Sequence, residues 1–414
     1  MQQEILANLD NPVQLEQLYR ANKSAFKKAF NLLAPELKDN KLLAYWDARL
    51  NFVKEEISFG SRREWLFVMV ACVLGGLIAK IPDIFDINEE YFYTRNIGFT
   101  VLPALSAYFA WKNKLPAGKI LFIASASLLS LLFINLLPDY PRSDSIALAC
   151  IHLVLFLWSV LGFSYVGEKS NNVEKRLGYL SYNGDLVVMT TLLLIAGAIL
   201  SGITIGLFSL IGFNIERFYF DNVIKFALPA APILGTYLTQ ANPQLVGKVS
   251  PVIAKIFSPL VLLMLSIYLI AIVYSGKDPY NDREFLMIFN ALLIGVMAII
   301  FFSVAESSKT GGKKMETWIL FLLSCLTIIV NVIAVSAILF RISEWGLSPN
   351  RAAVLGGNVL ILINLLMVTV QLFRAATRKT TIDAVGKVIS IYLPIYCAWT
   401  CIVTFLFPFL FGFK

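Results

Sequence analysis

The segment FYTRNIGFTVLPA, residues 92–104, has a second version further along the chain. Residues 218–230 read FYFDNVIKFALPA and match the first segment at six of thirteen positions, including the prolines Pro103 and Pro229. A fainter third version begins at Pro349. Each segment runs from polar residues into an apolar helix. Because self-similarity at a regular spacing is typical of duplicated architectures, these segments predict an internal repeat in an all-α protein.

The composition is typical of a membrane protein. Of the 414 residues, 58% are hydrophobic and 15% are charged, and the mean hydropathy is +0.72. Apolar runs long enough to cross a hydrocarbon layer of about 30 Å recur along the chain. The net charge is +8, but the Lys and Arg residues are dispersed among short loops. We therefore expect the lipid bilayer as a partner and no nucleic acid.

The apolar runs predict a polytopic membrane helix bundle of about eleven transmembrane helices. Residues 1–60 read as a small soluble helical domain, and residues 61–414 as the transmembrane domain. The expected spans are 64–81, 96–111, 119–137, 146–166, 186–211, 221–239, 256–275, 285–305, 317–340, 351–373 and 389–412. The repeat divides them into candidate units at 64–166, 186–305 and 317–412, which insert with the same sense and are parallel repeats.

The distribution of Lys and Arg predicts the orientation. Ten of these residues lie in the N-terminal domain and at the start of the first span, where Arg62 and Arg63 stand; fifteen lie in the five loops on the same side, and nine lie in the opposite loops and at the C-terminus. Basic residues resist translocation, so the richer side is cytoplasmic. The N-terminal domain is therefore expected in the cytoplasm and the C-terminus outside.

Groups that carry catalysis or bind a metal are nearly absent. The single histidine, His152, lies in the fourth span without a nearby acid, thiolate or second histidine. We therefore predict no catalytic, metal or cofactor site, and an interhelical hydrogen bond for His152, with a functional intramembrane group as the alternative. The carboxylates Asp185, Asp221 and Glu306 lie at span ends, which argues against proton- or sodium-coupled transport.

The repeat supplies the candidate cavity-lining or ligand residues. Pro103 and Pro229 each free a backbone carbonyl that protein or water must satisfy, so both are expected to face a central cavity. Asn96 occupies the position equivalent to Asn222 in the repeat. Four further asparagines are expected to bridge helices: Asn290, Asn331, Asn358 and Asn364.

Lys225 is the deepest charge in the sequence. Asp221 precedes it by four residues, so the two are expected to pair along the helix. Lys225 then has two interpretations: it snorkels to the outer interface, or it attracts an anion to the wall of a cavity.

The turn SEWGLSPNR, residues 343–351, is a candidate outer hairpin. Gly346 is expected to end one helix, and Ser348 with Pro349 to begin the next. Glu344 has Arg341 and Arg351 as candidate partners. The three charges in one tight turn fit either a structured hairpin or a ligand site.

This turn, followed by an apolar helix, resembles the bacterial family called domain of unknown function 4153. Residues 15–49, the junction EEIS at 55–58 and RNIGF at 95–99 are similar to its Bacteroidota-type members. The resemblance covers most of the chain. It implies a bacterial inner-membrane protein, in which the C-terminus that the loop charges place outside would be periplasmic, and it supplies no activity or site.

Two functional hypotheses follow from these patterns. The first is a transporter- or channel-like protein with a central cavity between the repeats. The alternative is a non-transporting envelope scaffold or sensor, in which residues 1–60 bind a cytoplasmic protein partner. A membrane enzyme is disfavoured because no acid–base or metal set is visible.

Overall fold

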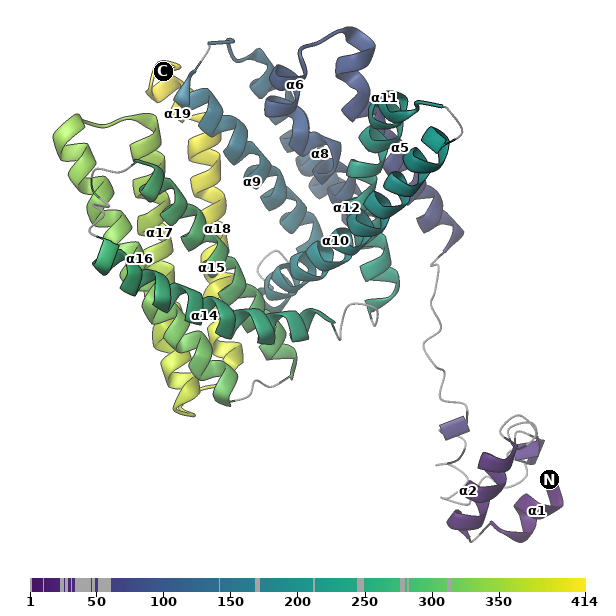
Figure 1. The fold of residues 1–414 in the computed structure, drawn as a ribbon. Coiled ribbons are helices and arrows are strands. Elements are labelled where there is room, and N and C mark those ends of the chain that lie inside the picture. The colour runs from purple at the N-terminus through teal and green to yellow at the C-terminus, as the bar shows by residue number, and fades with distance from the viewer. Residues whose placement is uncertain are drawn as a thin grey trace. The chain divides into compact units, whose positions relative to one another are not determined.

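The computed structural model divides the chain into two compact units, Met1–Ser58 and Phe59–Lys414 (Figure 1). The residues it describes are 2–9, 11–22, 26, 29–30, 32–33, 46, 49–50, 61–140, 142–167, 172–210, 213–243, 249–275, 280, 283–310 and 314–414. The junction at 55–58 and the boundary expected at residue 60 lie outside this part. All the secondary structure elements of the described residues are helices.

The N-terminal unit contains α1 (Gln2–Ala7) and α2 (Pro12–Ala21). The side chain of Asn11 caps α2 by accepting a hydrogen bond from the backbone N–H of Gln14 at 3.2 Å, and Pro12 occupies the first turn. The apolar side chains gather in a small core: Ile5, Leu15, Phe26, Ala29, Phe30, Leu33, Trp46 and Leu50. The unit therefore has a hydrophobic core of its own.

In its described residues the second unit is built from helices. Its elements are α5 (Arg62–Phe85), α6 (Glu89–Asn96), the 3₁₀ helix η2 (Ile97–Thr100), α7 (Leu102–Lys112), α8 (Ala117–Leu136), α9 (Asp144–Val166), α10 (Val173–Leu210), α11 (Glu216–Phe218), the π-helix η3 (Tyr219–Ile224), α12 (Lys225–Ala241), α14 (Val249–Ser275), α15 (Arg283–Thr310), α16 (Lys314–Trp345), α17 (Pro349–Ala376), α18 (Ile382–Phe405) and α19 (Phe407–Leu410).

Side-chain caps set several of these helix starts. Ser61 accepts a hydrogen bond from the backbone N–H of Glu64 at 3.1 Å and begins α5. Ser348 accepts from the N–H of Arg351 and begins α17, with Pro349 in its first turn. Each cap satisfies a backbone donor that has no partner inside the helix. Both starts agree with the sequence patterns.

Eight helices of the described residues are long and apolar enough to cross a membrane: Arg62–Phe85, Ala117–Leu136, Asp144–Val166, Val173–Leu210, Phe289–Ser308, Lys314–Trp345, Pro349–Ala376 and Ile382–Phe405. They overlap eight of the expected spans, although Ile382–Phe405 begins and ends seven residues before the span expected at 389–412. The spans expected at 96–111 and 221–239 correspond to broken helices, because η2 precedes α7 and η3 precedes α12. The span expected at 256–275 falls within α14. The count of eleven stays a prediction.

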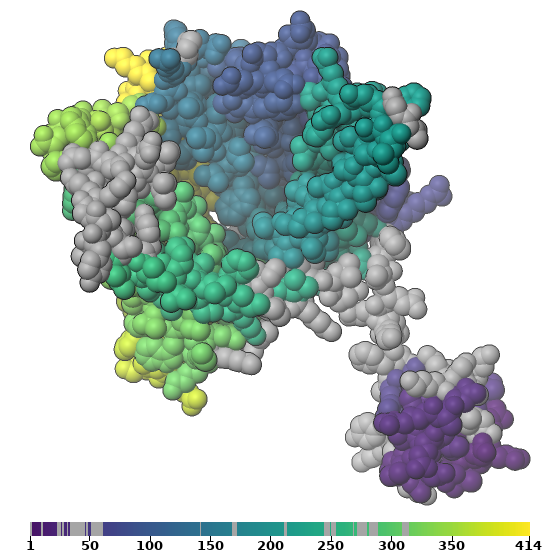
Figure 2. Space-filling model, in the orientation of Figure 1, coloured from purple at the N-terminus to yellow at the C-terminus, as the bar shows by residue number. Residues whose placement is uncertain are grey.

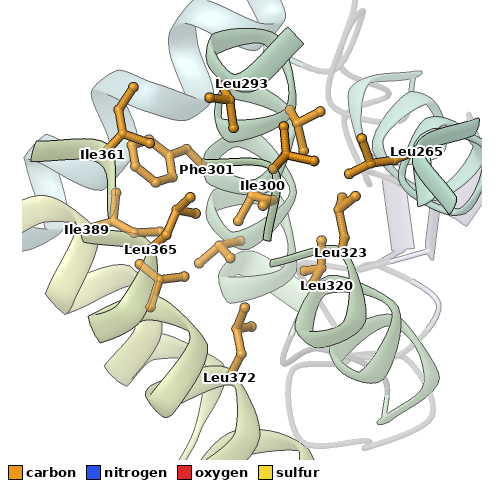
Figure 3. Packing of buried hydrophobic residues seen from close by; sticks show 14 of the residues in the cluster. Leu265, Leu293, Ile300, Phe301, Leu320, Leu323, Ile361, Leu365, Leu372 and Ile389 are labelled. Carbon is orange, nitrogen blue, oxygen red and sulfur yellow. The ribbon is translucent and has the colours of Figure 1, made fainter. Parts of the chain in front are cut away.

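The largest core lies among α14, α15, α16, α17 and α18 (Figure 3). The buried residues of α16 and α17 recur every three or four positions, so each helix turns one apolar stripe inward. The stripes meet around Leu323, Leu365 and Ile300, all fully buried. Packing of this kind leaves little room for water.

Helix packing does not follow the proposed repeat. α7 packs along α9, whereas its counterpart α12 packs against α5 and α10. In Figure 2 the teal residues of α10 and α12 lie along one side of the visible face, and green residues of the later helices lie along the other. The parallel repeat therefore stays a prediction from the sequence.

The C-terminal half of α10 exposes apolar side chains. In its most apolar stretch only 6% of the residues are buried. Leu200, Leu207 and Leu210 are all more than half exposed. An exposed apolar surface of this length suits contact with lipid tails.

Candidate functional site

Lys225 lies in a group of paired charges at one end of α5, α6 and α12, which we call the Lys225 cluster (Lys80, Asp83, Glu89 and Lys225). Its ammonium donates to Asp83 Oδ1 at 2.6 Å and to Glu89 Oε1 at 2.8 Å. The Lys225 side chain is only 17% exposed. Because two carboxylates compensate its charge, Lys225 joins helices instead of presenting a free positive charge to an anion.

The pairing of Asp221 with Lys225 is a wrong prediction. Asp221 lies 3.8 Å from Arg217, and its backbone carbonyl accepts from Lys80 Nζ at 2.6 Å. The same ammonium donates to Asn222 Oδ1 at 2.7 Å. The physical reason is competition: the Lys225 ammonium is engaged by Asp83 and Glu89, and Asp221 pairs with Arg217 on the preceding turn.

The two repeat prolines differ in their surroundings. Pro103 lies in the first turn of α7, where proline costs no helical hydrogen bond. Pro229 is buried inside α12, and a Cβ added at Gly75 of α5 would lie 3.3 Å from its Cβ. A Cβ at Gly76 would lie 2.0 Å from the Phe226 ring. Pro229 therefore faces closely packed protein.

Asn96 is buried and forms a partly buried polar contact between α6 and α8. Its side chain exchanges two hydrogen bonds with Asn135, at 2.9 and 2.8 Å. The neighbouring Arg95, which is 5% exposed, donates to the backbone carbonyls of Ile134, Leu137 and Pro138 at the end of α8. Both residues therefore hold helices together.

His152 is bonded within its own helix. Its Nδ1 lies 2.9 Å from the carbonyl oxygen of Leu148, so the hydrogen bond is intrahelical and the interhelical prediction is wrong. The reason is geometric, because a residue one helical turn earlier offers its carbonyl at close range. No group of three His, Cys, Asp or Glu side chains in the described residues is arranged to hold a metal ion.

The outer hairpin is closed by its arginines. Arg351 donates to the carbonyls of Trp345 and Gly346 at 2.8 and 2.7 Å. The guanidinium of Arg341 lies 5.2 Å from the centre of the Trp345 ring. Among the described residues Glu344 forms no ion pair with either arginine, because both of them engage the turn itself. The structured-hairpin interpretation therefore explains this segment.

A polar cavity lies where the sequence patterns did not point, between α14, α15 and α16. We call it the Glu306 cavity. It has a volume of ≈ 30 Å³, enough for one or two water molecules. Its lining residues are Ala254, Lys255, Ser258, Pro259, Ser303, Glu306, Ser307, Glu316, Ile319 and Leu320. Leu320 also belongs to the apolar core of Figure 3.

Glu306 is the buried carboxylate of this cavity, with 3% of its surface exposed. The expected span ended at residue 305, but α15 continues to Thr310 and carries Glu306 inside the bundle. The hydroxyl of Ser181 on α10 donates to Glu306 Oε1. A carboxylate withdrawn from water needs such donors or a cation. The spacing of three between Ser303 and Glu306 places both on one helical face and was the available signal.

The serine hydroxyls of the cavity are oriented by their partners. Ser258 donates to the carbonyl of Ala254 at 2.8 Å and lies 2.9 Å from Ser303 Oγ. Each hydroxyl has one proton. The proton of Ser258 is therefore used, and Ser303 is the donor in the contact between the two. What the hydroxyls still offer is lone pairs.

The cavity also has an ion pair and a proline on its wall. Lys255 on α14 lies 3.4 Å from Glu316 on α16, and the lysine side chain is 41% exposed. Pro259 has no N–H, so the carbonyl four residues earlier, that of Lys255, lacks its usual helical donor. Lys255 and Pro259 both line the cavity.

Comparison with known proteins gives no help in assigning this site. No family model matches the chain, and no curated protein or solved structure matches it either. The resemblance to domain of unknown function 4153 stays a prediction.

The class of protein follows from the fold itself. The many apolar helices make the chain a multi-pass integral membrane protein of the α-helical class.

Proposed function

We propose that the protein is transporter- or channel-like and acts in a bacterial inner membrane, with its N-terminus in the cytoplasm and its C-terminus in the periplasm. The orientation rests on the loop charges. The proposal replaces the cavity expected around Pro103 and Pro229 with the Glu306 cavity. A buried carboxylate is costly in an apolar bundle, and for this reason the proposal rests on Glu306.

The observation that carries the proposal is the buried, acceptor-rich lining of the Glu306 cavity. Ser258 is 5%, Ser303 4% and Glu306 3% exposed. Ionisable residues inside a membrane bundle are costly and mark ion or substrate pathways. The adjoining Leu320 and Leu323 show that the surrounding core is apolar. A carboxylate kept at this place is therefore a functional candidate.

Cysteine accessibility tests the proposal. The five native cysteines, Cys72, Cys150, Cys325, Cys397 and Cys401, are replaced, and single cysteines are introduced as Ser258→Cys or Ser303→Cys. A small charged thiol reagent is applied to intact cells and to inside-out vesicles. We expect both positions to react from the cytoplasmic side, and more slowly from the outside. Leu323→Cys, at a fully buried apolar position, is the matched control and should stay protected.

Protection of both cavity positions from either side would contradict transport. For that conclusion the variants must still react after denaturation and must elute as folded protein. Labelling of Leu323→Cys at the same rate would show that the whole bundle opens to the reagent, and the cavity would then not be a selective water-accessible path.

A groove on the N-terminal unit favours a second function, the binding of a cytoplasmic protein. This groove has a volume of ≈ 760 Å³ and is lined by Pro12, Val13, Glu16, Gln17, Arg20, Trp46 and Arg49. Arg49 lies 5.0 Å from the Trp46 ring centre and 5.3 Å from that of Tyr19. The groove therefore combines one tryptophan with two arginines, and aromatic residues and arginine are enriched at protein interfaces.

Site-specific photo-crosslinking tests this second function. A photoreactive residue replaces Val13, which is 67% exposed in the groove, or Leu6, which is 43% exposed outside it. A discrete adduct from position 13 and none from position 6 is expected in cells. Equal adducts, or none, would contradict a docking role for the groove.

A further inference from the structure

We propose that the hairpin between α17 and α18 binds the headgroup of an anionic phospholipid. We call it the Arg378 hairpin and define it by four cationic side chains: Arg374, Arg378, Lys379 and Lys387. Three features of the molecule support this site: the charge of the hairpin, its turn, and the apolar face of α17 that leads to it. Lipid binding here is independent of transport through the Glu306 cavity.

The Arg378 hairpin carries a positive charge that the described part of the protein does not compensate. All four cationic side chains are exposed. Among the residues that the structure describes, none of their charged groups forms an ion pair or a hydrogen bond. Residues 374–387 contain one carboxylate, that of Asp383, so the segment has a net charge of +3. A positive surface of this kind beside a membrane attracts anionic lipids.

Cations in other loops on the same predicted side of the membrane have partners within the protein. The ammonium of Lys112 lies 3.6 Å from the Glu64 carboxylate. That of Lys119 donates to the carbonyl of Gly167 at 3.0 Å. These two lysines use their charge to hold helices together, whereas the Arg378 hairpin keeps its charge available for an external ligand.

The turn holds the cations at the ends of two helices that are apolar enough to cross a membrane. α17 ends at Ala376, α18 begins at Ile382, and the two helices pack side by side (Figure 1). The N–H of Lys379 donates to the carbonyl of Arg374 at 2.8 Å, and Arg378 has a φ of 61°. Glycine usually takes this left-handed position, so an arginine introduces strain here that glycine would not. The five connecting residues reach at most about 17 Å, which keeps the charges near the bilayer surface.

An exposed apolar face of α17 leads directly to Arg374. Ile363, Met367 and Val370 are 45%, 42% and 57% exposed. Their spacing of three and four residues places them on the same helical face as Arg374. At 1.5 Å per residue, Ile363 lies about 16 Å from Arg374, which is about half the thickness of a hydrocarbon layer of about 30 Å. Acyl chains along this face therefore bring their phosphate headgroup to the hairpin.

Aromatic rings lie at the same level. Phe373, which precedes Arg374, is 44% exposed, and its ring centre lies 6.4 Å from that of Trp318 on α16. Tryptophan is enriched at the membrane–water interface because its ring is amphipathic. A phospholipid uses the apolar face, the interfacial rings and the charges together. Inorganic phosphate or an acidic protein uses the charges alone.

Native mass spectrometry of the purified full-length protein tests the inference. The protein in detergent is titrated with phosphatidylglycerol and with phosphatidylcholine that has the same acyl chains. We expect one saturable site whose affinity for phosphatidylglycerol is at least about tenfold higher, since each basic residue near an anionic surface contributes about fivefold. Equal affinities for the two lipids would overturn the inference.

Two quadruple variants locate the site. The first carries Arg374→Gln, Arg378→Gln, Lys379→Gln and Lys387→Gln, and its affinity for phosphatidylglycerol should fall on the order of 100-fold. The matched control replaces four exposed cations at other helix ends on the same predicted side, and its affinity should change less than about threefold. It carries Arg62→Gln, Arg63→Gln, Lys114→Gln and Lys175→Gln. Both variants lose four positive charges, so equal losses of affinity would overturn the assignment to this hairpin.

Photo-crosslinking of the wild-type protein keeps the test independent of how the variants fold. A phosphatidylglycerol with a photoreactive group near its headgroup should label residues 374–387, and inorganic phosphate in excess at constant ionic strength should not prevent this. Labelling spread evenly over the other loops, or displacement of the lipid by inorganic phosphate, would overturn the inference. Lipid binding together with protected cavity cysteines would reject transport and keep the lipid site.

Discussion

Replacement of Arg95 by alanine is the sharpest test of how this bundle is held together. The arginine is 5% exposed, and its guanidinium donates to the carbonyls of Ile134, Leu137 and Pro138 at 2.7, 3.0 and 3.1 Å. These carbonyls lie at the C-terminal end of α8, where the chain offers no further helical backbone N–H to donate to them. A positive charge at a helix C-terminus also interacts favourably with the helix dipole.

The magnitude follows from these three contacts. A hydrogen bond from a charged group contributes about 1.5–3 kcal/mol, so three independent bonds would contribute roughly 4.5–9 kcal/mol. They share one guanidinium and are not additive, and water can reach part of the vacated site. We therefore expect Arg95→Ala to lower the free energy of unfolding by about 3–5 kcal/mol.

The assay is reversible unfolding in mixed micelles, compared with a matched arginine variant. Arg217 is 97% exposed and lies 3.8 Å from Asp221, so Arg217→Ala should cost about 0–1 kcal/mol. Arg95→Lys keeps the charge but loses the geometry of the guanidinium and should fall between the two. If Arg95→Ala unfolds within about 0.5 kcal/mol of Arg217→Ala, the C-terminal cap contributes nothing measurable and the reasoning is refuted.

Three further predictions concern packing, charge and pH. Gly76→Ala places a Cβ 2.0 Å from the Phe226 ring of α12 and should destabilise the bundle by about 1–3 kcal/mol. Gly118→Ala, where a Cβ meets nothing within 4 Å, should be neutral or stabilising, and equal unfolding curves of the two variants would contradict this reasoning. Lys225→Met leaves Asp83 and Glu89 without their shared partner, so the free energy of unfolding should fall by roughly 1–2 kcal/mol and should depend less on NaCl. An unchanged salt dependence would contradict a stabilising role for the Lys225 cluster. A hydrogen bond from Arg20 lowers the pKa of Glu16 below its usual 4.5, so the ionised Glu16 stabilises α2 fully above that pH, and this stabilisation is lost as the pH falls through the folded-state pKa. Hydrogen exchange of α2 in the full chain should show this loss in the wild-type protein and not in Glu16→Gln.

Local patterns in the sequence predicted the features that depend on neighbouring residues. The caps at Ser61 and Ser348 lie where the motifs place them, because a cap involves residues only three apart. The eight apolar helices follow from run length alone. Lys225 also stood out as the deepest charge, and the structure finds it largely buried.

Contacts between segments distant in the chain could not be predicted from the sequence. The carboxylates that pair with Lys225 lie 142 and 136 residues before it, and no local spacing connects them to it. The sequence places Glu306 at a span end because charge lowers the local hydropathy, although α15 continues past it. Its burial depends on α10, α14 and α16, which only the folded bundle brings together. Sequence patterns therefore locate helices better than the polar groups between them.

The Lys225 cluster also sets an order of assembly during synthesis. Asp83 and Lys225 are separated by 142 residues. At about 5–20 residues per second, roughly 7–28 s pass between the appearance of the carboxylate and that of the ammonium at the ribosome. During this interval Asp83 has only Lys80, on its own helix, as a partner. We therefore expect α5 to insert before this contact exists, and the arrival of α12 to close it.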